Sequence, residues 1–237
     1  MSIYVTSDLH LSLSVDKPMY IFGDKWIDHH IKIKNDWEDK VLDNDTVIIV
    51  GDISWGINLE EAMLDLEWID KLPGKKILSK GNHDYWWESM AKLNKNFPRL
   101  NFLQNNSYVV ENIGIIGTRS WISPFSNESD LNDKKIYERE LHRLGLSINH
   151  LKSQKNYSDI EKIYCFIHYP PFDDKIEKTG MVKLLEDFNS KSDIKITNVF
   201  FGHVHSFYEK VKQGNFNNIN YEMITCDYKD FKLVKIN

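Results

Sequence analysis

Side chains that bind metal ions or transfer protons occur in five short stretches of the sequence, each directly after an apolar run. The stretches contain Asp8 and His10, Asp52, Asn82 with His83 and Asp84, His168, and His203 with His205. A D-x-H or H-x-H pair alone is a weak signal, but five such stretches in one chain are hard to assign to chance. Without His83 and Asp84, seven oxygen and nitrogen donors remain, none of them a cysteine, and this set suits two ions of the Mn, Fe or Zn type. We therefore predict that the five stretches meet at one metal centre.

The central stretch is Lys76–Asp84, in which an apolar run leads into Gly81 and then an amide, an imidazole and a carboxylate. A strand would give these side chains a rigid base, and glycine would let the backbone turn sharply beneath them. Asn, His and Asp in a row are poor helix and strand formers, so tertiary structure or function must hold them in place.

The elements that carry these stretches alternate between strand and helix patterns in the first half of the chain. Strands are expected at 3–7, 46–50 and 75–79, and helices at 24–42, 59–69 and 85–97. Short connections between such elements are typical of βαβ units and a largely parallel sheet. Ligand sites of open α/β sheets lie beyond the carboxyl ends of the strands, where the candidate residues stand.

The second half predicts more strands and two further helices. Strands are expected at 100–104, 108–111, 113–117, 163–167, 197–201, 207–211, 221–225 and 231–236, and helices at 136–151 and 181–188. No repeat or linker divides the chain. We infer an α/β fold of two packed sheets flanked by helices, in one domain.

Length and charge restrict the function classes. The 237 residues suit one large domain, and a hydrophobic content of 41% is ample for a core. The 30 basic and 35 acidic side chains give a net charge of -5, which speaks against generic nucleic-acid binding. No signal peptide or membrane span is visible, and the two cysteines have no C-x-x-C spacing. We expect a cytoplasmic protein without a membrane partner.

The ordered motifs D-x-H, G-D, G-N-H-D, H and G-H-x-H, from Asp8 to His205, resemble the calcineurin-like metallophosphoesterase superfamily. The resemblance implies a four-layer αββα sandwich of two mixed sheets, forming a single metallophosphoesterase domain over residues 1–237. It also implies a dinuclear centre of divalent or trivalent transition-metal ions (Mn, Fe or Zn), of which we favour Mn²⁺.

Carried over residue by residue, the resemblance assigns a role to each motif position. Asp8, His10 and His205 would bind one ion, Asn82, His168 and His203 the other, and Asp52 would bridge the two. His83 would be the catalytic histidine and Asp84 its orienting partner. The expected reaction is hydrolysis of a small phosphomonoester or phosphodiester by attack of a metal-bound hydroxide, which two cations about 3.5–4 Å apart can share.

Around this centre the sequence offers weaker hypotheses. Arg119 could bind a phosphate oxygen through its planar guanidinium, and a surface ion pair is the equal alternative. Aromatic residues near the motifs could stack on a substrate, but we expect at least two of them to be core; they are Trp55, Tyr85, Trp86, Trp87 and Trp121. The segment 122–144 could act as a lid.

Several alternatives stay open at this point. Outside enzymes, a catalytically weak scaffold of the same fold would bind a protein partner, although such a protein should lack several ligands. Within the superfamily, the lipid A pathway hydrolase matches poorly because, in that group, arginine stands where this chain has His83. A nuclease resembling the Mre11 family is disfavoured by the acidic charge. A small regulatory phosphodiesterase and a protein phosphatase remain, and the sequence leaves substrate and oligomeric state undetermined.

Overall fold

The computed structural model describes residues 1–173, 175 and 178–237, which divide into two compact units. The first unit consists of Met1–Phe102, His203–Tyr208 and Ile224–Asn237, and the second of Leu103–Gly202 and Glu209–Met223. The single-domain prediction for residues 1–237 stays a prediction, and each unit is described here by itself.

The first unit is built on a five-stranded sheet in the order β11-β1-β2-β3-β4. Its strands are β1 (Ile3–Thr6), β2 (Thr46–Val50), β3 (Lys75–Ser79), β4 (Leu100–Leu103) and β11 (Val234–Lys235). β1, β2 and β3 run parallel, whereas β11 is antiparallel to β1. The carboxyl ends of the three parallel strands therefore share one edge of the sheet.

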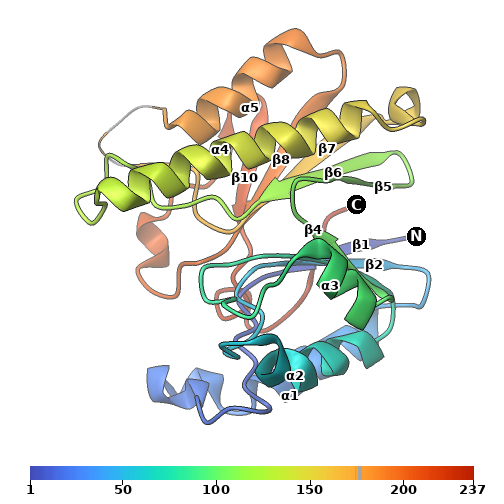
Figure 1. Ribbon diagram of the computed structural model, residues 1–237, viewed down its shortest axis with the longest axis vertical. Coiled ribbons are helices and arrows are strands. Elements are labelled where there is room, and N and C mark those ends of the chain that lie inside the picture. The colour runs from blue at the N-terminus through green and yellow to red at the C-terminus, as the bar shows by residue number, and fades with distance from the viewer. Residues whose placement is uncertain (174, 176–177) are drawn as a thin grey trace. The chain divides into compact units, whose positions relative to one another are not determined.

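Helices of the first unit cover one face of this sheet (Figure 1). They are α1 (His29–Lys40), α2 (Leu59–Lys71) and α3 (Met90–Asn96), with the short 3₁₀ helices η1 (Met19–Phe22) and η2 (Asp24–Trp26) before α1. Alternate strand residues such as Val47 and Ile49 pack with Trp37 of α1 and Leu66 of α2 in one buried cluster. Burial of this apolar stripe stabilises the positions of the strand ends.

The second unit has a six-stranded sheet in the order β5-β6-β7-β8-β10-β9. Its strands are β5 (Tyr108–Val110), β6 (Ile113–Thr118), β7 (Lys162–Ile167), β8 (Lys195–Phe201), β9 (Gly214–Phe216) and β10 (Ile219–Met223). The helices α4 (Leu131–Lys152) and α5 (Gly180–Lys191) lie beside each other on one face, and η3 (Tyr157–Asp159) and η4 (Tyr208–Lys210) are short 3₁₀ turns (Figure 1). β6, β7, β8 and β10 run parallel, with antiparallel strands at both edges.

The predicted fold class is confirmed: the chain is α/β with two mixed sheets flanked by helices. Strands β2 and β3 have the predicted bounds. The helix expected over 24–42 is interrupted before α1, where Asp28 takes a left-handed φ of 54°. The helix expected over 85–97 forms only as α3, because residues 85–87 make turns back to His83 and Asp84.

One further expectation was wrong, and one strand was missed. The strand predicted at 207–211 is instead the 3₁₀ helix η4, and the hairpin strand β9 was not predicted. The proposed lid segment 122–144 is partly regular structure, since its residues from Leu131 onward belong to α4. α4 packs on β6, and Leu144 is fully buried, while the lid role of the segment stays a prediction.

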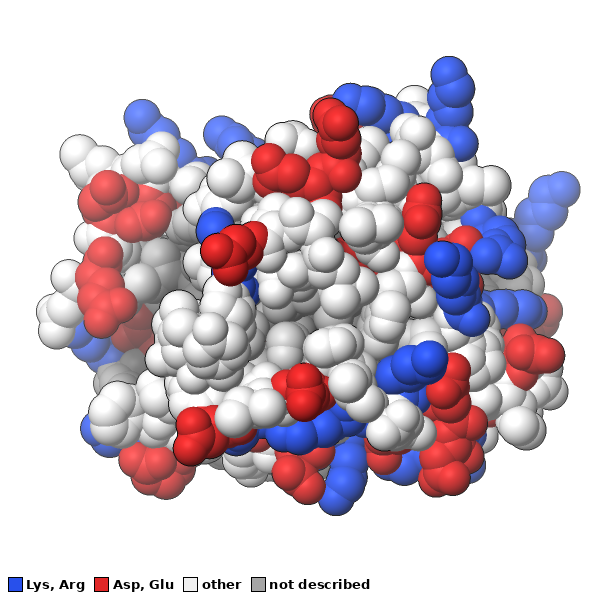
Figure 2. All heavy atoms as spheres, turned by 90° about the horizontal axis from the view of Figure 1, so that it is seen from below, with Lys and Arg blue, Asp and Glu red and all other residues white. Residues whose placement is uncertain are grey.

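Surface charge agrees with the mixed composition. On the face shown in Figure 2, acidic and basic side chains are interspersed around uncharged areas, and neither sign forms a large continuous patch. In the part of the chain that the structure describes, the helices are all too short or too polar to cross a membrane.

Candidate metal centre

The parallel strands of the first unit bring three of the predicted motifs to one edge of the sheet. Asp8 follows β1, Asp52 follows β2, and Asn82 follows β3. His203 and His205 belong to the same unit, and the backbone N–H of His203 donates to both carboxylate oxygens of Asp8, at 3.1 and 3.0 Å. Residues separated by almost two hundred positions are thus joined directly.

One group of donors consists of Asp8, His10 and His205, whose ligand atoms all lie within 4.8 Å of one another. The two Nε2 atoms of His10 and His205 are 3.1 Å apart, and His205 Nε2 lies 3.5 Å from Asp8 Oδ1. Asp8 and His10 are buried and His205 is half-buried. This is the trio predicted to bind one ion.

The remaining predicted donors of the first unit lie next to this trio. Asp52 Oδ2 is 3.8 Å from His10 Nε2, and a carboxylate oxygen of Asp52 lies within 4.8 Å of a ring nitrogen of His203. His203 Nδ1 is 3.0 Å from Asn82 Oδ1. The first unit by itself therefore gathers six of the seven predicted ligands.

The donor set fits transition-metal ions. Asp8 and Asp52 are only 0% and 1% exposed, and carboxylates buried to this degree are normally ion-paired or metal-bound. Their neighbours in the group are imidazoles, which are good ligands for zinc, iron and related ions. His10 Nδ1 is buried and has no hydrogen-bond partner among the described residues, while its Nε2 points to the other donors. Carboxylate oxygens and imidazole nitrogens thus converge without a thiol.

Protonation of the two imidazoles also suits a cation site. Burial lowers the pKa of His10 to about 4, so its ring is neutral near pH 7 and offers a lone pair. For His205 burial acts in the same direction, but hydrogen bonds to Asp227 and Asp8 outweigh it and raise the pKa to about 10. His205 therefore carries a proton between two carboxylates, and a bound cation would replace it.

The backbone at four predicted ligands is left-handed. The φ angles are 59° at Asp8, 45° at His10, 49° at Asp52 and 74° at His203. Such conformations are uncommon outside glycine and cost roughly 1–3 kcal/mol each. They persist where surrounding contacts determine the geometry, and they aim the side chains of consecutive strand ends toward one point.

Gly81 is required for a reason different from the one the sequence suggested. Its φ is not left-handed, whereas Gly51, before Asp52, has a φ of 82°. A Cβ atom at position 81 would lie 2.1 Å from Asp52 Oδ1 and 2.2 Å from its backbone nitrogen. The absence of a side chain lets the end of β3 approach Asp52 closely, and the backbone N–H of His83 then donates to Asp52 Oδ1 at 2.8 Å.

Asp84 connects two loops beside the predicted site. Its carboxylate accepts hydrogen bonds from four donors, namely the backbone N–H groups of Gly81, Ile53 and Ser54 and the Trp86 indole N–H. Among the described residues none of its hydrogen bonds goes to the His83 ring. Asp84 thus ties the loop after β2 to the loop after β3, and its predicted role as the orienting partner of His83 stays a prediction.

Aromatic rings lie against His10 and His83. The Trp55 ring is stacked on His10 at 4.8 Å between centroids and lies 4.6 Å from the His83 ring. Trp86 and Trp87 are buried in the core, as expected for at least two of the five candidates, whereas Tyr85 is exposed. Of the candidate aromatic residues in the first unit, Trp55 thus lies nearest to the rings of His10 and His83.

The second unit carries the two remaining predicted residues. His168 follows β7 and Arg119 follows β6, and the backbone carbonyl of Arg119 accepts from the N–H groups of His168 and Tyr169, at 3.1 and 3.2 Å. The two residues therefore stand side by side at the carboxyl edge of this sheet. Ligation of a metal by His168 together with Asn82 and His203 stays a prediction.

Arg119 does form an ion pair, but a largely buried one. Its Nη2 lies 3.2 Å from Glu140 Oε1, and Arg143 Nη1 lies 2.7 Å from the same oxygen. The guanidinium also lies 4.3 Å from the centre of the Trp121 ring. Glu140 thus binds two arginines, and the surface ion pair considered for Arg119 is replaced by this internal network.

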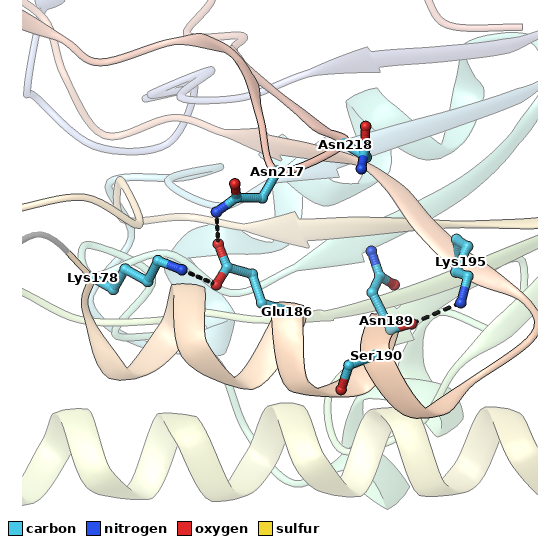
Figure 3. A pocket seen from close by; sticks show the side chains of 7 residues that line it. All are labelled: Lys178, Glu186, Asn189, Ser190, Lys195, Asn217 and Asn218. Carbon is cyan, nitrogen blue, oxygen red and sulfur yellow. Dashed lines mark hydrogen bonds and ion pairs between the residues drawn. The ribbon is translucent and has the colours of Figure 1, made fainter.

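A separate polar pocket of about 510 Å³ lies in the second unit, between α5, the start of β8 and the turn between β9 and β10 (Figure 3). Within it Glu186 accepts from Lys178 Nζ and from Asn217 Nδ2, and Lys195 Nζ donates to the Asn189 carbonyl. The Asn217 bond holds the hairpin turn against α5, and the Lys195 bond joins the start of β8 to the same helix, so these polar contacts have a structural explanation.

Sequence reasoning missed Asp227, whose Oδ1 lies 3.1 Å from His205 Nδ1. The available signal was weak: an acidic residue a few positions beyond the predicted strand at 221–225. The other contacts of Asp227, to Lys25 and Tyr208, come from distant parts of the sequence and have no motif.

Comparisons with known proteins agree with this geometry. Residues 1–207 match the family model described as calcineurin-like phosphoesterase. The "Gene 66 protein" of Mycobacterium phage L5 is 36% identical over 81 residues, which are 34% of this chain and 39% of that protein. Its counterpart in Mycobacterium phage D29 is 36% identical over 89 residues, or 35% and 40% of the two chains.

The chain thus spans about two fifths of the length of the curated relatives it matches, 39% and 40%. Among solved structures, a protein of unknown function from Aquifex aeolicus, AQ665, is similar with a TM-score of 0.54 at 16% identity, covering 99% of this chain and 95% of that one. That likeness supports the fold alone. With the family model matched over most of its residues, the chain belongs to the calcineurin-like phosphoesterase family.

Proposed function

We propose that the protein is a metal-dependent phosphoesterase that hydrolyses a small phosphomonoester or phosphodiester at a dinuclear centre. The observation that carries the proposal is the convergence of six nitrogen and oxygen donors at the strand ends of the first unit. His168 would complete the second group of ligands. Mn²⁺ is the ion we favour, with Fe and Zn as the other candidates.

Asp52 is the residue best suited to bridge the two ions. One of its oxygens is 3.8 Å from His10, a member of the first group, and the carboxylate also lies near His203 of the second. Asn82 would add an oxygen without negative charge, which keeps the centre attractive to an anionic ester. Two cations, when bound, would lower the pKa of a water shared between them and hold two phosphoryl oxygens.

His83 is placed to exchange a proton rather than to bind metal. Its backbone is fixed by the bond to Asp52, its ring lies against Trp55, and the side chain is only half-buried. A half-buried imidazole can reach a leaving oxygen and donate a proton to it as the ester bond breaks. Asp84, in contrast, contributes by holding the loop that presents His83.

Arg119 is proposed to bind the substrate phosphate. It stands next to His168, and its Nε is buried without a hydrogen-bond partner among the described residues. Its Nη2 is already paired with Glu140, so the guanidinium has a fixed direction. A planar guanidinium held in this way can donate to an additional oxygen.

Removal of metal should abolish activity. Chelator-treated protein is expected to hydrolyse neither p-nitrophenyl phosphate nor bis-p-nitrophenyl phosphate, and titration with Mn²⁺ should restore turnover of one of them. Preference for the diester would indicate a phosphodiesterase, and preference for the monoester a phosphatase. Protein that binds no metal and turns over neither ester would contradict the proposal and favour the scaffold alternative.

Substitutions at Asp52 and His83 should separate metal binding from proton transfer. Asp52→Asn is expected to lower metal content and activity together, because the bridging carboxylate loses its charge. His83→Ala should retain metal while kcat falls by about 10²–10⁴-fold, the usual contribution of a general acid. Metal analysis of the purified variants beside their kinetics checks this, and loss of metal in His83→Ala would refute the assigned role.

Asp84→Asn should reduce stability, since the amide cannot accept from donors on both of its ends. We expect the free energy of unfolding in urea to fall by about 2 kcal/mol. Asp65→Asn is the matched control, because Asp65 is also buried and accepts from Leu13 N–H and the Ser54 hydroxyl. If Asp84→Asn lowered kcat far more than Asp65→Asn at equal stability loss, Asp84 would have a catalytic role after all.

Arg119→Lys tests the proposed contact between Arg119 and the substrate phosphate. Arg143→Lys is its control, because both arginines pair with the same Glu140 oxygen. Lysine keeps the charge next to Glu140 but loses the planar fork. We expect kcat/KM to fall about tenfold, through KM, in Arg119→Lys only, which corresponds to about 1.4 kcal/mol of binding. Equal kinetics in the two variants would leave Arg119 a purely structural residue.

A further inference from the structure

A buried carboxylate lies behind one of the predicted metal ligands. Asp227 has a fully buried side chain, and its Oδ1 is 3.1 Å from Nδ1 of His205. The opposite ring nitrogen of His205, Nε2, is the atom that points to His10 and Asp8. The imidazole is therefore held between a carboxylate on one side and the candidate metal site on the other.

Asp227 is itself held by two donors from other parts of the first unit. Its Oδ2 accepts from Lys25 Nζ at 2.7 Å and from the Tyr208 hydroxyl at 2.6 Å. Lys25 and Tyr208 are also joined to each other at 2.8 Å. With one oxygen fixed by these two donors, the other oxygen has a defined position and faces Nδ1 of His205.

Hydrogen bonding from Nδ1 to a carboxylate determines the state of the ring. A proton on Nδ1, directed at Asp227, leaves the lone pair of Nε2 facing the candidate site. We infer that Asp227 is a positioning residue for the metal centre: it fixes the tautomer and the orientation of His205, and Lys25 and Tyr208 in turn fix Asp227. This inference rests on the proposed metal-binding function.

The support that Asp227 gives to His205 should change the binding of only one of the two ions. His10 belongs to the same trio, but its Nδ1 has no hydrogen-bond partner among the described residues, so within this trio the carboxylate support acts on His205. Asp227 bonds to His205, whereas His203, a predicted ligand of the other ion, has its Nδ1 3.0 Å from Asn82 Oδ1. Substitution of Asp227 should thus lower the affinity for the ion that Asp8, His10 and His205 are predicted to bind.

The test is calorimetric titration of chelator-treated protein with Mn²⁺, comparing wild type, Asp227→Asn and Tyr208→Phe. We expect two binding events in the wild type and an affinity loss of about 10–100-fold for one of them in Asp227→Asn. Tyr208→Phe keeps the carboxylate on His205 and should lose less affinity. At saturating Mn²⁺ the kcat of Asp227→Asn should recover, because the residue touches neither substrate nor the reacting atoms.

The outcomes distinguish this inference from the proposed function. If the wild type bound no Mn²⁺, the metal-centre proposal itself would fail. If it bound two ions and Asp227→Asn bound both with unchanged affinity, the positioning role would be overturned. Equal weakening of both ions, with a thermal midpoint lowered to the same extent in Asp227→Asn and Tyr208→Phe, would show a general structural effect and would also overturn it.

Discussion

Two carboxylates almost fully removed from water, Asp8 and Asp52, impose the constraint on which the centre depends. An ionised carboxylate without compensation is costly in a protein interior, so the surrounding groups must supply positive charge or donors. The left-handed backbone at both residues turns each carboxylate toward the imidazoles, and the N–H groups of His83 and His203 anchor them there. The glycine at position 81 is needed because nothing larger fits against Asp52.

The surroundings of His10 and His205 explain why the pKa values of these two neighbouring histidines differ. His10 is buried with its Nε2 near Asp52, and burial dominates, so the ring is neutral. His205 has a carboxylate on each side, and their hydrogen bonds dominate. Two imidazoles whose Nε2 atoms are 3.1 Å apart thus enter metal binding from different protonation states. A bound divalent cation would take the place of the His205 proton and neutralise the carboxylate charge.

The chemistry-bearing side chains could be predicted from the sequence because each is local to a strand end. Parallel strands deliver residues such as Asp8, Asp52 and Asn82 to one edge without knowledge of any long-range contact. What supports these residues could not be predicted in the same way. The role of Asp84 depends on N–H groups of the adjacent loop, and that of Asp227 on residues about 20 and 200 positions away.

Short apolar runs were the other source of error. Residues 207–211 alternate in the manner of a strand but form η4, where the Tyr208 hydroxyl bonds to Asp227. Likewise the apolar residues at 85–97 have the spacing of a helix. Residues 85–87 are not helical, however, because they form hydrogen bonds to the G-N-H-D loop. In both places tertiary hydrogen bonds near the site outweigh local propensity.

The discontinuity of the first unit has a consequence for how the protein is made. The bonds from His203 to Asp8 span 195 residues, and that from Ile3 to Asn237 spans 234. During synthesis the early strands emerge well before their partners, so the sheet edge stays without two of its predicted ligands until His203 and His205 have left the ribosome. Contacts of such high sequence separation form late and slowly. Metal loading would therefore follow the completion of folding and could serve as the final step that secures it.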